Sequence, residues 1–216
     1  MDRVWDVAYR TEVGHVRARN EDAVLARPER GLVAVADGLG GHPAGDVASL
    51  TALRRIDELD VSGSSAADDL VAAIAAAHEA VLEAGRTPER YGMGTTVVLA
   101  ALSDARAVIG HVGDSRAYLR EPDGRLRQLT RDHGMHGMLT QALGLDRDVK
   151  PDVVEVGLAP GARLLLCTDG LTNMVGDDAL ADLLATGRAQ EACDALVEAA
   201  LAAGGVDNVS VVVASL

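Results

Sequence analysis

The order of predicted elements along the chain indicates an α+β fold in which helices cover stacked antiparallel sheets. One apolar strand is followed by two consecutive helices, a block of several strands, a second helical segment and a last strand. This order lacks the regular alternation of strand and helix that is typical of parallel doubly wound folds. With 216 residues and 48% hydrophobic content, the chain can bury the core of one domain, which we expect to span residues 1–216.

Apolar patterns predict the elements in the first half of the chain. Residues 32–37 form an aliphatic, β-branched run that is typical of a buried strand. Beyond a glycine-rich segment, apolar residues recur three positions apart from Val47 to Leu59, which predicts an amphipathic helix. A second helix is expected after the capping-box pattern at residues 65–68, with Leu70, Val71 and Leu82 among the apolar residues on one face. These two helices should pair antiparallel.

Three further strands are predicted at residues 95–102, 107–112 and 117–120. Because only short connections separate them, we expect them to be antiparallel neighbours. Helical periodicity returns between Leu180 and Leu201, and residues 209–215 supply a last strand.

The formal net charge of −13 disfavours binding to nucleic acid or to an anionic membrane surface. No stretch approaches the roughly 20 apolar residues of a membrane-spanning helix, and the first residues lack the apolar region of a secretory signal. Cys167 and Cys193 fit packed, reduced thiols better than a disulfide framework or a zinc site. We expect a soluble, cytoplasmic protein, and a monomer.

Aspartates stand at the ends of three apolar runs. Two runs close in the steps Asp37-Gly38 and Asp169-Gly170, and Asp207 opens a third run. A single Asp-Gly step is more often a tight turn, which is how we interpret Asp123-Gly124. Three carboxylates at strand ends, together with residues 20–22 near the N-terminus, instead indicate a site for hard cations. Oxygen ligands select Mg²⁺ or Mn²⁺ over zinc.

These positions fit a centre with two such ions that share an aspartate and a bridging hydroxide. In this interpretation Asp37 bridges the ions. The four expected sources of metal ligands are Asp37, the carbonyl of Gly38, Asp169 and Asp207. The residues expected to orient metal-bound waters from behind these ligands are Glu21, Asp22 and Asn208.

Seven short motifs follow one another in order over nearly the whole chain. They are residues 14–22, 36–42, 92–96, 113–116, 129–133, 168–172 and 207–210. Any one of them could arise by chance, whereas the ordered set is specific. With these motifs the chain resembles the PPM (PP2C-type) metal-dependent protein serine/threonine phosphatases, and their bacterial members in particular.

This resemblance implies an α-β-β-α sandwich of two antiparallel sheets flanked by helix pairs, with a two-metal cleft at one end of the sheets. It implies two Mn²⁺ or Mg²⁺ ions and a third, weaker one, for which Asp114 matches the family's ligand. Alternatively, Asp114 is a turn residue that pairs with Arg116. Arg17 matches the residue that clamps the substrate phosphate, and its alternative is a surface ion pair with Glu21 or Asp22.

The activity that the resemblance implies is hydrolysis of phosphoserine and phosphothreonine in proteins, by direct attack of the bridging hydroxide on phosphorus. A partner serine/threonine kinase, or its targets, would then be the family's usual source of substrates. Some eukaryotic relatives place a histidine two residues after the bridging aspartate. Leu39 stands there in this chain, so the general acid is unassigned, and we interpret His42 as a turn residue. The alternative function is a catalytically silent pseudophosphatase that binds phosphoproteins, which the three intact core aspartates disfavour.

The main departure from the family follows Asp132-His133, where bacterial relatives usually carry a longer flap beside the active site. Only residues 134–138 stand here, so the flap segment is nearly absent. In the family the flap helps to shape the substrate groove and the third-metal site, so its loss would affect the role of Asp114 and the substrate selectivity. Alternatively, the loss would open the site to bulky substrates. His133 and His136 have a helix-like spacing, but neighbouring glycines and the lack of cysteine partners argue against a zinc site. His78 and His111 are expected in packed or sheet positions.

Overall fold

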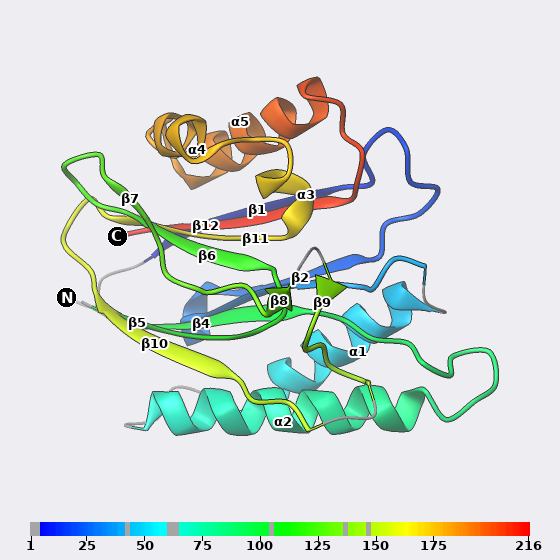
Figure 1. Ribbon diagram of the computed structural model, residues 1–216. Helices are drawn as coiled ribbons and strands as arrows, with labels where there is room; N and C mark the ends of the chain where they lie inside the picture. The colour runs from blue at the N-terminus through cyan, green and yellow to red at the C-terminus, as the bar shows by residue number, and fades with distance from the viewer. Residues whose placement is uncertain (1–4, 42–43, 60–64, 104–105, 136–137, 146–147) are drawn as a thin grey trace.

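The computed structural model describes residues 5–41, 44–59, 65–103, 106–135, 138–145 and 148–216. Two five-stranded antiparallel sheets pack face to face, and helices cover the outer face of each sheet (Figure 1). The α-β-β-α sandwich that the sequence implied is therefore confirmed.

The first sheet is built around the last strand of the chain. Its strands, in spatial order, are β1 (Asp6–Glu12), β12 (Val209–Ser215), β11 (Arg163–Cys167), β6 (Arg116–Arg120) and β7 (Leu126–Gln128). All neighbours are antiparallel, and β12 pairs with β1 along its full length. The predicted strand at residues 209–215 is thus a central strand of this sheet.

The second sheet carries the first of the predicted aspartates. Its spatial order is β10 (Asp152–Gly157), β5 (Arg106–Val112), β4 (Val97–Ser103), β3 (Leu32–Asp37) and β2 (Asp22–Arg27). Every residue from Leu32 to Ala36 is fully buried, because helices cover one face of β3 and the other sheet covers the opposite face. A strand buried on both faces reads as a continuous apolar run, as observed here.

Helices form the two outer layers. The second sheet is covered by α1 (Gly45–Asp57) and α2 (Ala66–Ala84). The first sheet is covered by α3 (Asp169–Thr172), α4 (Asp177–Leu183) and α5 (Ala189–Ala202). A short 3₁₀ turn, η1 (Pro28–Arg30), and a small hairpin of β8 (Gly134–Met135) and β9 (Met138–Leu139) complete the described elements.

The buried faces of α1 and α2 differ in part from the predicted ones. Leu50 is 43% exposed and Val71 is 39% exposed, although both were placed on the apolar faces. Alanines such as Ala48 and Ala52 are fully buried instead. A helix has 3.6 residues per turn, so residues spaced three apart drift away from one face. Small residues between the predicted positions therefore complete the buried face.

The connection between β5 and β6 crosses from one sheet to the other. The prediction that strands 107–112 and 117–120 are neighbours is therefore wrong, since β5 pairs with β4 and β10 while β6 pairs with β11 and β7. Gly113 makes the crossing possible with a φ of +108°, a value that disfavours residues with a Cβ. Asp114 consequently lies where the ends of the two sheets meet.

The two cysteines and the lengths of the helices bear on the expectations drawn from composition. Cys167 and Cys193 are buried free thiols in the layer between the first sheet and α5. Within the described ranges, none of the helices has both the length and the apolar character needed to cross a bilayer.

We predict that Gly170→Ala lowers the free energy of unfolding by about 2–3 kcal/mol. Gly170 lies in α3 against the backbone of Asn208, and a Cβ there would collide with the Asn208 carbonyl oxygen. The matched control is Gly157→Ala, because no atom lies within 4 Å of a Cβ at that position. Urea unfolding of both variants checks the prediction, and equal stabilities would contradict it.

Candidate functional site

One cavity of about 520 Å³ collects the predicted site residues at one end of the sandwich. The predicted residues that line it are Arg17, Glu21, Asp37, Gly38, Asp114, Asp169, Asp207 and Asn208. Asp22 lies behind this lining, paired with Asp37 in the register of β2 and β3. The structure thus brings together residues that are up to 191 positions apart in the chain.

Two threonines hold the backbone of Asp37, the last residue of β3. The Asp37 N–H donates to Oγ1 of Thr96 over 3.1 Å. The Asp37 carbonyl oxygen accepts from the Thr95 hydroxyl and from the Thr96 N–H, each over 2.8 Å. With its backbone fixed in this way, the residue presents its carboxylate to the cavity.

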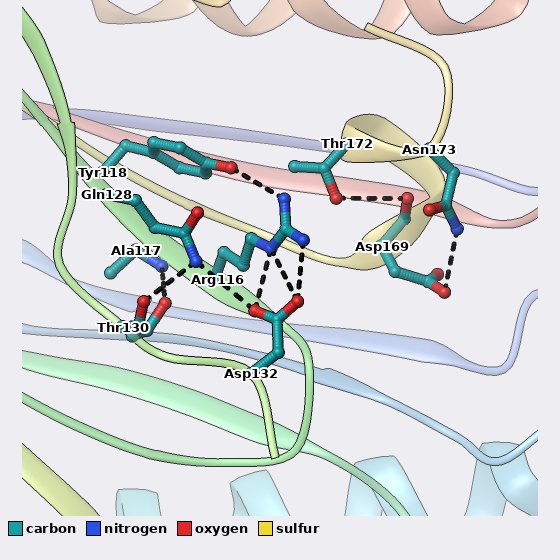
Figure 2. Close-up of polar contacts among 9 residues, drawn as sticks. All are labelled: Arg116, Ala117, Tyr118, Gln128, Thr130, Asp132, Asp169, Thr172 and Asn173. Atoms are coloured by element: carbon teal, nitrogen blue, oxygen red, sulfur yellow. Dashed lines mark hydrogen bonds and ion pairs between the residues drawn. The ribbon is translucent and has the colours of Figure 1, made fainter. Parts of the chain in front are cut away.

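Thr168 joins the carboxylate of Asp22 on the second sheet to β12 of the first sheet. Its hydroxyl donates to Oδ2 of Asp22 over 3.0 Å and accepts the Ser210 N–H over 3.0 Å. Asp169 follows as the first residue of α3, and its Oδ2 accepts from the Asn173 side-chain amide over 3.1 Å (Figure 2). Among the described residues, Oδ1 of Asp22 and Oδ1 of Asp169 are buried without a hydrogen-bond partner.

Asn208 ties the N-terminal loop to the start of β12. Its Oδ1 accepts the Glu21 N–H over 2.8 Å, and its Nδ2 donates to the carbonyls of Val13 and Arg19 over 2.9 and 3.0 Å. Its own N–H donates to Oδ1 of Asp207 over 2.8 Å. The side chain of Asn208 is therefore engaged with backbone groups and acts on the site by placing Glu21 and Asp207.

Arg17 lies at the mouth of the cavity with 40% of its side chain exposed. Its Nη2 donates to Oδ2 of Asp207 over 2.7 Å. The alternative considered from the sequence, an ion pair with Glu21 or Asp22, is thus replaced by a pair with a predicted metal ligand.

Asp114 lines the cavity next to a strong ion pair that it does not join. Arg116 donates from Nε and Nη2 to Asp132 over 2.9 and 2.7 Å, and from Nη1 to the Tyr118 hydroxyl over 3.0 Å (Figure 2). The turn pairing of Asp114 with Arg116 is therefore not what the structure contains. Burial, reinforced by the charge of Asp169, raises the pKa of Asp114 to about 6.

The buried carboxylates destabilise one another's charged forms. Burial raises the pKa of Asp22 to about 7 and that of Asp37 well above its ordinary value, and neighbouring aspartates add to both shifts. The pKa of Asp169 is raised by burial and by the charge of Asp207. Converging carboxylate oxygens, two of them without a hydrogen-bond donor, form a donor set that fits hard divalent cations.

The short segment after His133 forms the β8–β9 hairpin, which contributes Met138 and Leu139 to the cavity lining. Met138 is 70% exposed. Leu39 and Leu145 also line the cavity, so apolar side chains form part of the lining beside the carboxylates. The interpretations of His42 and His136 lie outside the described residues.

Sequence reasoning missed the hydroxyl residues that position the aspartates. Thr95, Thr96 and Thr168 hold the backbone or side chains of neighbouring strands, and Thr96 also shares a 2.7 Å hydrogen bond with Ser115. These residues are fully or almost fully buried. The available signal was their place at the ends of apolar runs, where a buried hydroxyl needs a partner.

Comparison with known proteins places the chain in a family. The model of the protein phosphatase 2C family matches residues 13–203. The serine/threonine protein phosphatase PstP of Mycobacterium tuberculosis is 36% identical in an alignment that covers 97% of this chain and 44% of PstP. The serine/threonine phosphatase stp of Listeria innocua is 34% identical, covering 94% of this chain and 92% of that protein.

A solved structure agrees with this placement. The catalytic domain of PstP in complex with two manganese ions superposes with a TM-score of 0.90 at 36% identity, covering 98% of each chain. The chain spans less than half the length of full-length PstP. The chain belongs to the protein phosphatase 2C family.

We predict that the metal-free protein loses stability as the pH rises from about 4 to 7. Asp22 titrates near pH 7 in the folded chain and near 3.8 when unfolded, so the folded chain holds the additional proton in this window. The raised pKa values of Asp37 and Asp169 act in the same direction. A shift of the Asp22 size corresponds to at most roughly 4 kcal/mol.

Urea unfolding in EDTA across this pH range measures the effect. Asp22→Asn removes the titrating group with little change of shape, so its decline with pH should be shallower than that of the wild type. Asp178→Asn, an exposed change on α4, is the control and should follow the wild type. A wild-type stability that rises through this window would contradict the prediction.

Proposed function

We propose that this chain is a metal-dependent phosphatase that hydrolyses phosphoserine and phosphothreonine in proteins. The observation that carries the proposal is the convergence of three aspartates and Arg17 in one cavity. Membership of the protein phosphatase 2C family supports it, as do the two manganese ions in the complex of the similar PstP domain.

The proposed ligands of two Mn²⁺ or Mg²⁺ ions are Asp37, the carbonyl of Gly38, Asp169 and Asp207. When bound, such ions supply Lewis acidity and lower the pKa of water. Glu21 and Asp22 lie beside and behind these ligands, where their oxygens can orient water. Asp114 is proposed for a third, weaker ion, since its carboxylate lines the same cavity.

Arg17 is proposed to bind the phosphate of the substrate. A guanidinium presents parallel N–H donors that match two phosphate oxygens. Its exposure at the cavity mouth lets an incoming phosphoryl group reach it, and it counters the charge of the carboxylates on that side. The apolar edge formed by Met138, Leu139 and Leu145 offers contact to residues that flank the phosphorylated one.

The proposed partners are a serine/threonine kinase and the proteins that it phosphorylates. A phosphoprotein phosphatase removes the phosphoryl groups that such a kinase adds. The proposal also includes a cytoplasmic location and a monomeric state. The two buried free cysteines suit a reducing compartment. Sedimentation of the purified chain tests the monomer.

We predict that the chain hydrolyses a phosphothreonine peptide with Mn²⁺ or Mg²⁺ and that EDTA abolishes turnover. Asp37→Asn and Asp169→Asn should each lower the rate by roughly 100-fold or more, because each removes an anionic ligand from the catalytic centre. Asp178→Asn should keep the wild-type rate. Phosphate release under saturating peptide measures all three variants.

A folded wild-type chain that binds Mn²⁺ in calorimetry yet releases no phosphate would overturn the enzyme proposal. Binding of the phosphopeptide without turnover would then favour the pseudophosphatase. Both outcomes are read from the same protein preparation.

We predict that Arg17→Ala lowers kcat/KM for the phosphopeptide by roughly 10- to 100-fold, since it removes a charge-assisted contact to the phosphate. Arg17→Lys should recover only part of the loss, because an ammonium lacks the two-pronged geometry. The control Arg55→Ala removes an arginine of α1 whose side chain is as exposed as that of Arg17, at 40%. Kinetics at saturating Mn²⁺ separate phosphate binding from metal binding, and an unchanged kcat/KM in Arg17→Ala would refute the assignment.

A further inference from the structure

His133 lies at the junction of three segments that border the proposed catalytic site. The backbone N–H of His133 donates to the Gly113 carbonyl over 2.9 Å. The ring Nδ1 of His133 accepts the Gly113 N–H over 3.2 Å. Its carbonyl accepts the Thr140 N–H at the end of the hairpin over 2.8 Å. Its Nε2 lies 3.2 Å from Oδ2 of Asp152 on β10. Gly113 directly precedes Asp114, so His133 grips the turn that carries this carboxylate.

The residue before His133 is also anchored to the same turn. Asp132 receives the two-pronged contact from Arg116, which lies two residues after Asp114. The dipeptide 132–133 therefore holds the turn at both ends, at Gly113 and at Arg116. Asp114 stands between these two attachments and lines the cavity.

The contacts of His133 define the tautomer of its ring. Because Nδ1 accepts the Gly113 N–H, the proton of the neutral imidazole is on Nε2, which donates to Asp152. His111 stacks on this ring with centroids 4.6 Å apart and an interplanar angle of 23°. Burial lowers the pKa of His111 to about 4, so the stacked neighbour is neutral.

A metal ion is the competing explanation for this cluster. One donor atom each from His111, His133 and Asp152 lies within 4.8 Å of the others. A ring that binds a metal through Nε2 carries its proton on Nδ1, however, and that proton would oppose the Gly113 N–H. The hydrogen bonds therefore favour a positioning role for His133 over a ligand role.

We propose that His133, with its proton on Nε2, is a positioning residue that fixes Asp114 in the catalytic cavity and ties it to the β8–β9 hairpin. The inference rests on the proposed phosphatase function. It assigns a role to the segment that links the shortened flap to the site. His133 acts through the backbone of Gly113 and touches no reacting atom.

Two substitutions separate the contacts of the ring. In His133→Asn the side-chain oxygen can stand where Nδ1 stands and accept the Gly113 N–H, whereas His133→Leu loses both ring contacts. We expect His133→Leu to lower kcat by roughly 10-fold with a smaller change in KM, because a displaced group near the reacting centre lowers the rate of chemistry. We expect His133→Asn to restore most of the rate.

A double-mutant cycle with Asp114→Asn decides whether His133 acts through Asp114. If it does, His133→Leu has little further effect on kcat in the Asp114→Asn background. Fully additive losses would overturn the proposal, as would a His133→Asn variant as slow as His133→Leu.

Hydrogen exchange at the Gly113 and Thr140 amides tests the proposal without any turnover. His133→Leu should speed hydrogen exchange at the Gly113 amide, whereas His133→Asn should leave this amide protected. Urea unfolding confirms that both variants fold. Equal Gly113 exchange in wild type and His133→Leu would overturn the inference even if the chain is an active phosphatase. Tight Zn²⁺ binding under excess Mg²⁺, lost in His133→Leu, would also overturn it in favour of the metal explanation. If the wild type shows no turnover but Gly113 exchange changes as expected, the proposed function is wrong and the positioning role of His133 stands.

Discussion

Mutual repulsion between buried carboxylates is the constraint around which this end of the molecule is built. Asp22, Asp37 and Asp169 are brought together where the ends of the two sheets meet, and burial makes each negative charge unfavourable. Such a group of acids gains nothing for a packed core, since apolar residues of similar size would be more stable there. Its presence makes sense as a cation-binding centre, and the stability of the surrounding sandwich is what keeps the acids close.

The sandwich meets this constraint with a framework of neutral hydrogen bonds. Thr168 joins Asp22 of the second sheet to the first sheet, and Thr96 joins the end of β3 to the turn between the sheets through Ser115. Asn208 fastens the N-terminal loop to the start of β12. None of these side chains adds a charge. The carboxylates therefore remain available to cations while their positions are fixed by hydroxyl and amide groups.

The strands that lead to Asp37 and Asp169 could be predicted from sequence, because strands buried on both faces leave long aliphatic runs that end abruptly at a polar residue. The partners of those strands could not. The step from β5 to β6 is as short as a hairpin connection, yet Gly113 turns it into a crossing between sheets, and only packing decides between the two. Leu50 illustrates the same limit on a helix, where the small Ala48 and Ala52 are buried and the larger Leu50 is partly exposed.

The ion pair between Arg17 and Asp207 places a guanidinium on Oδ2 of Asp207, an oxygen that a bound cation would also use. Oδ1 of Asp207 accepts the Asn208 N–H and Oδ2 accepts the guanidinium, so a cation that binds Oδ2 competes with Arg17 for this oxygen. Displacement leaves Arg17 without its carboxylate partner and free to receive an anion. Thermodynamic reciprocity then requires that an anion held by Arg17 strengthen cation binding at Asp207 by the same factor. Metal and phosphate would thus load the site cooperatively, and removal of the metal would weaken the binding of an anion at Arg17.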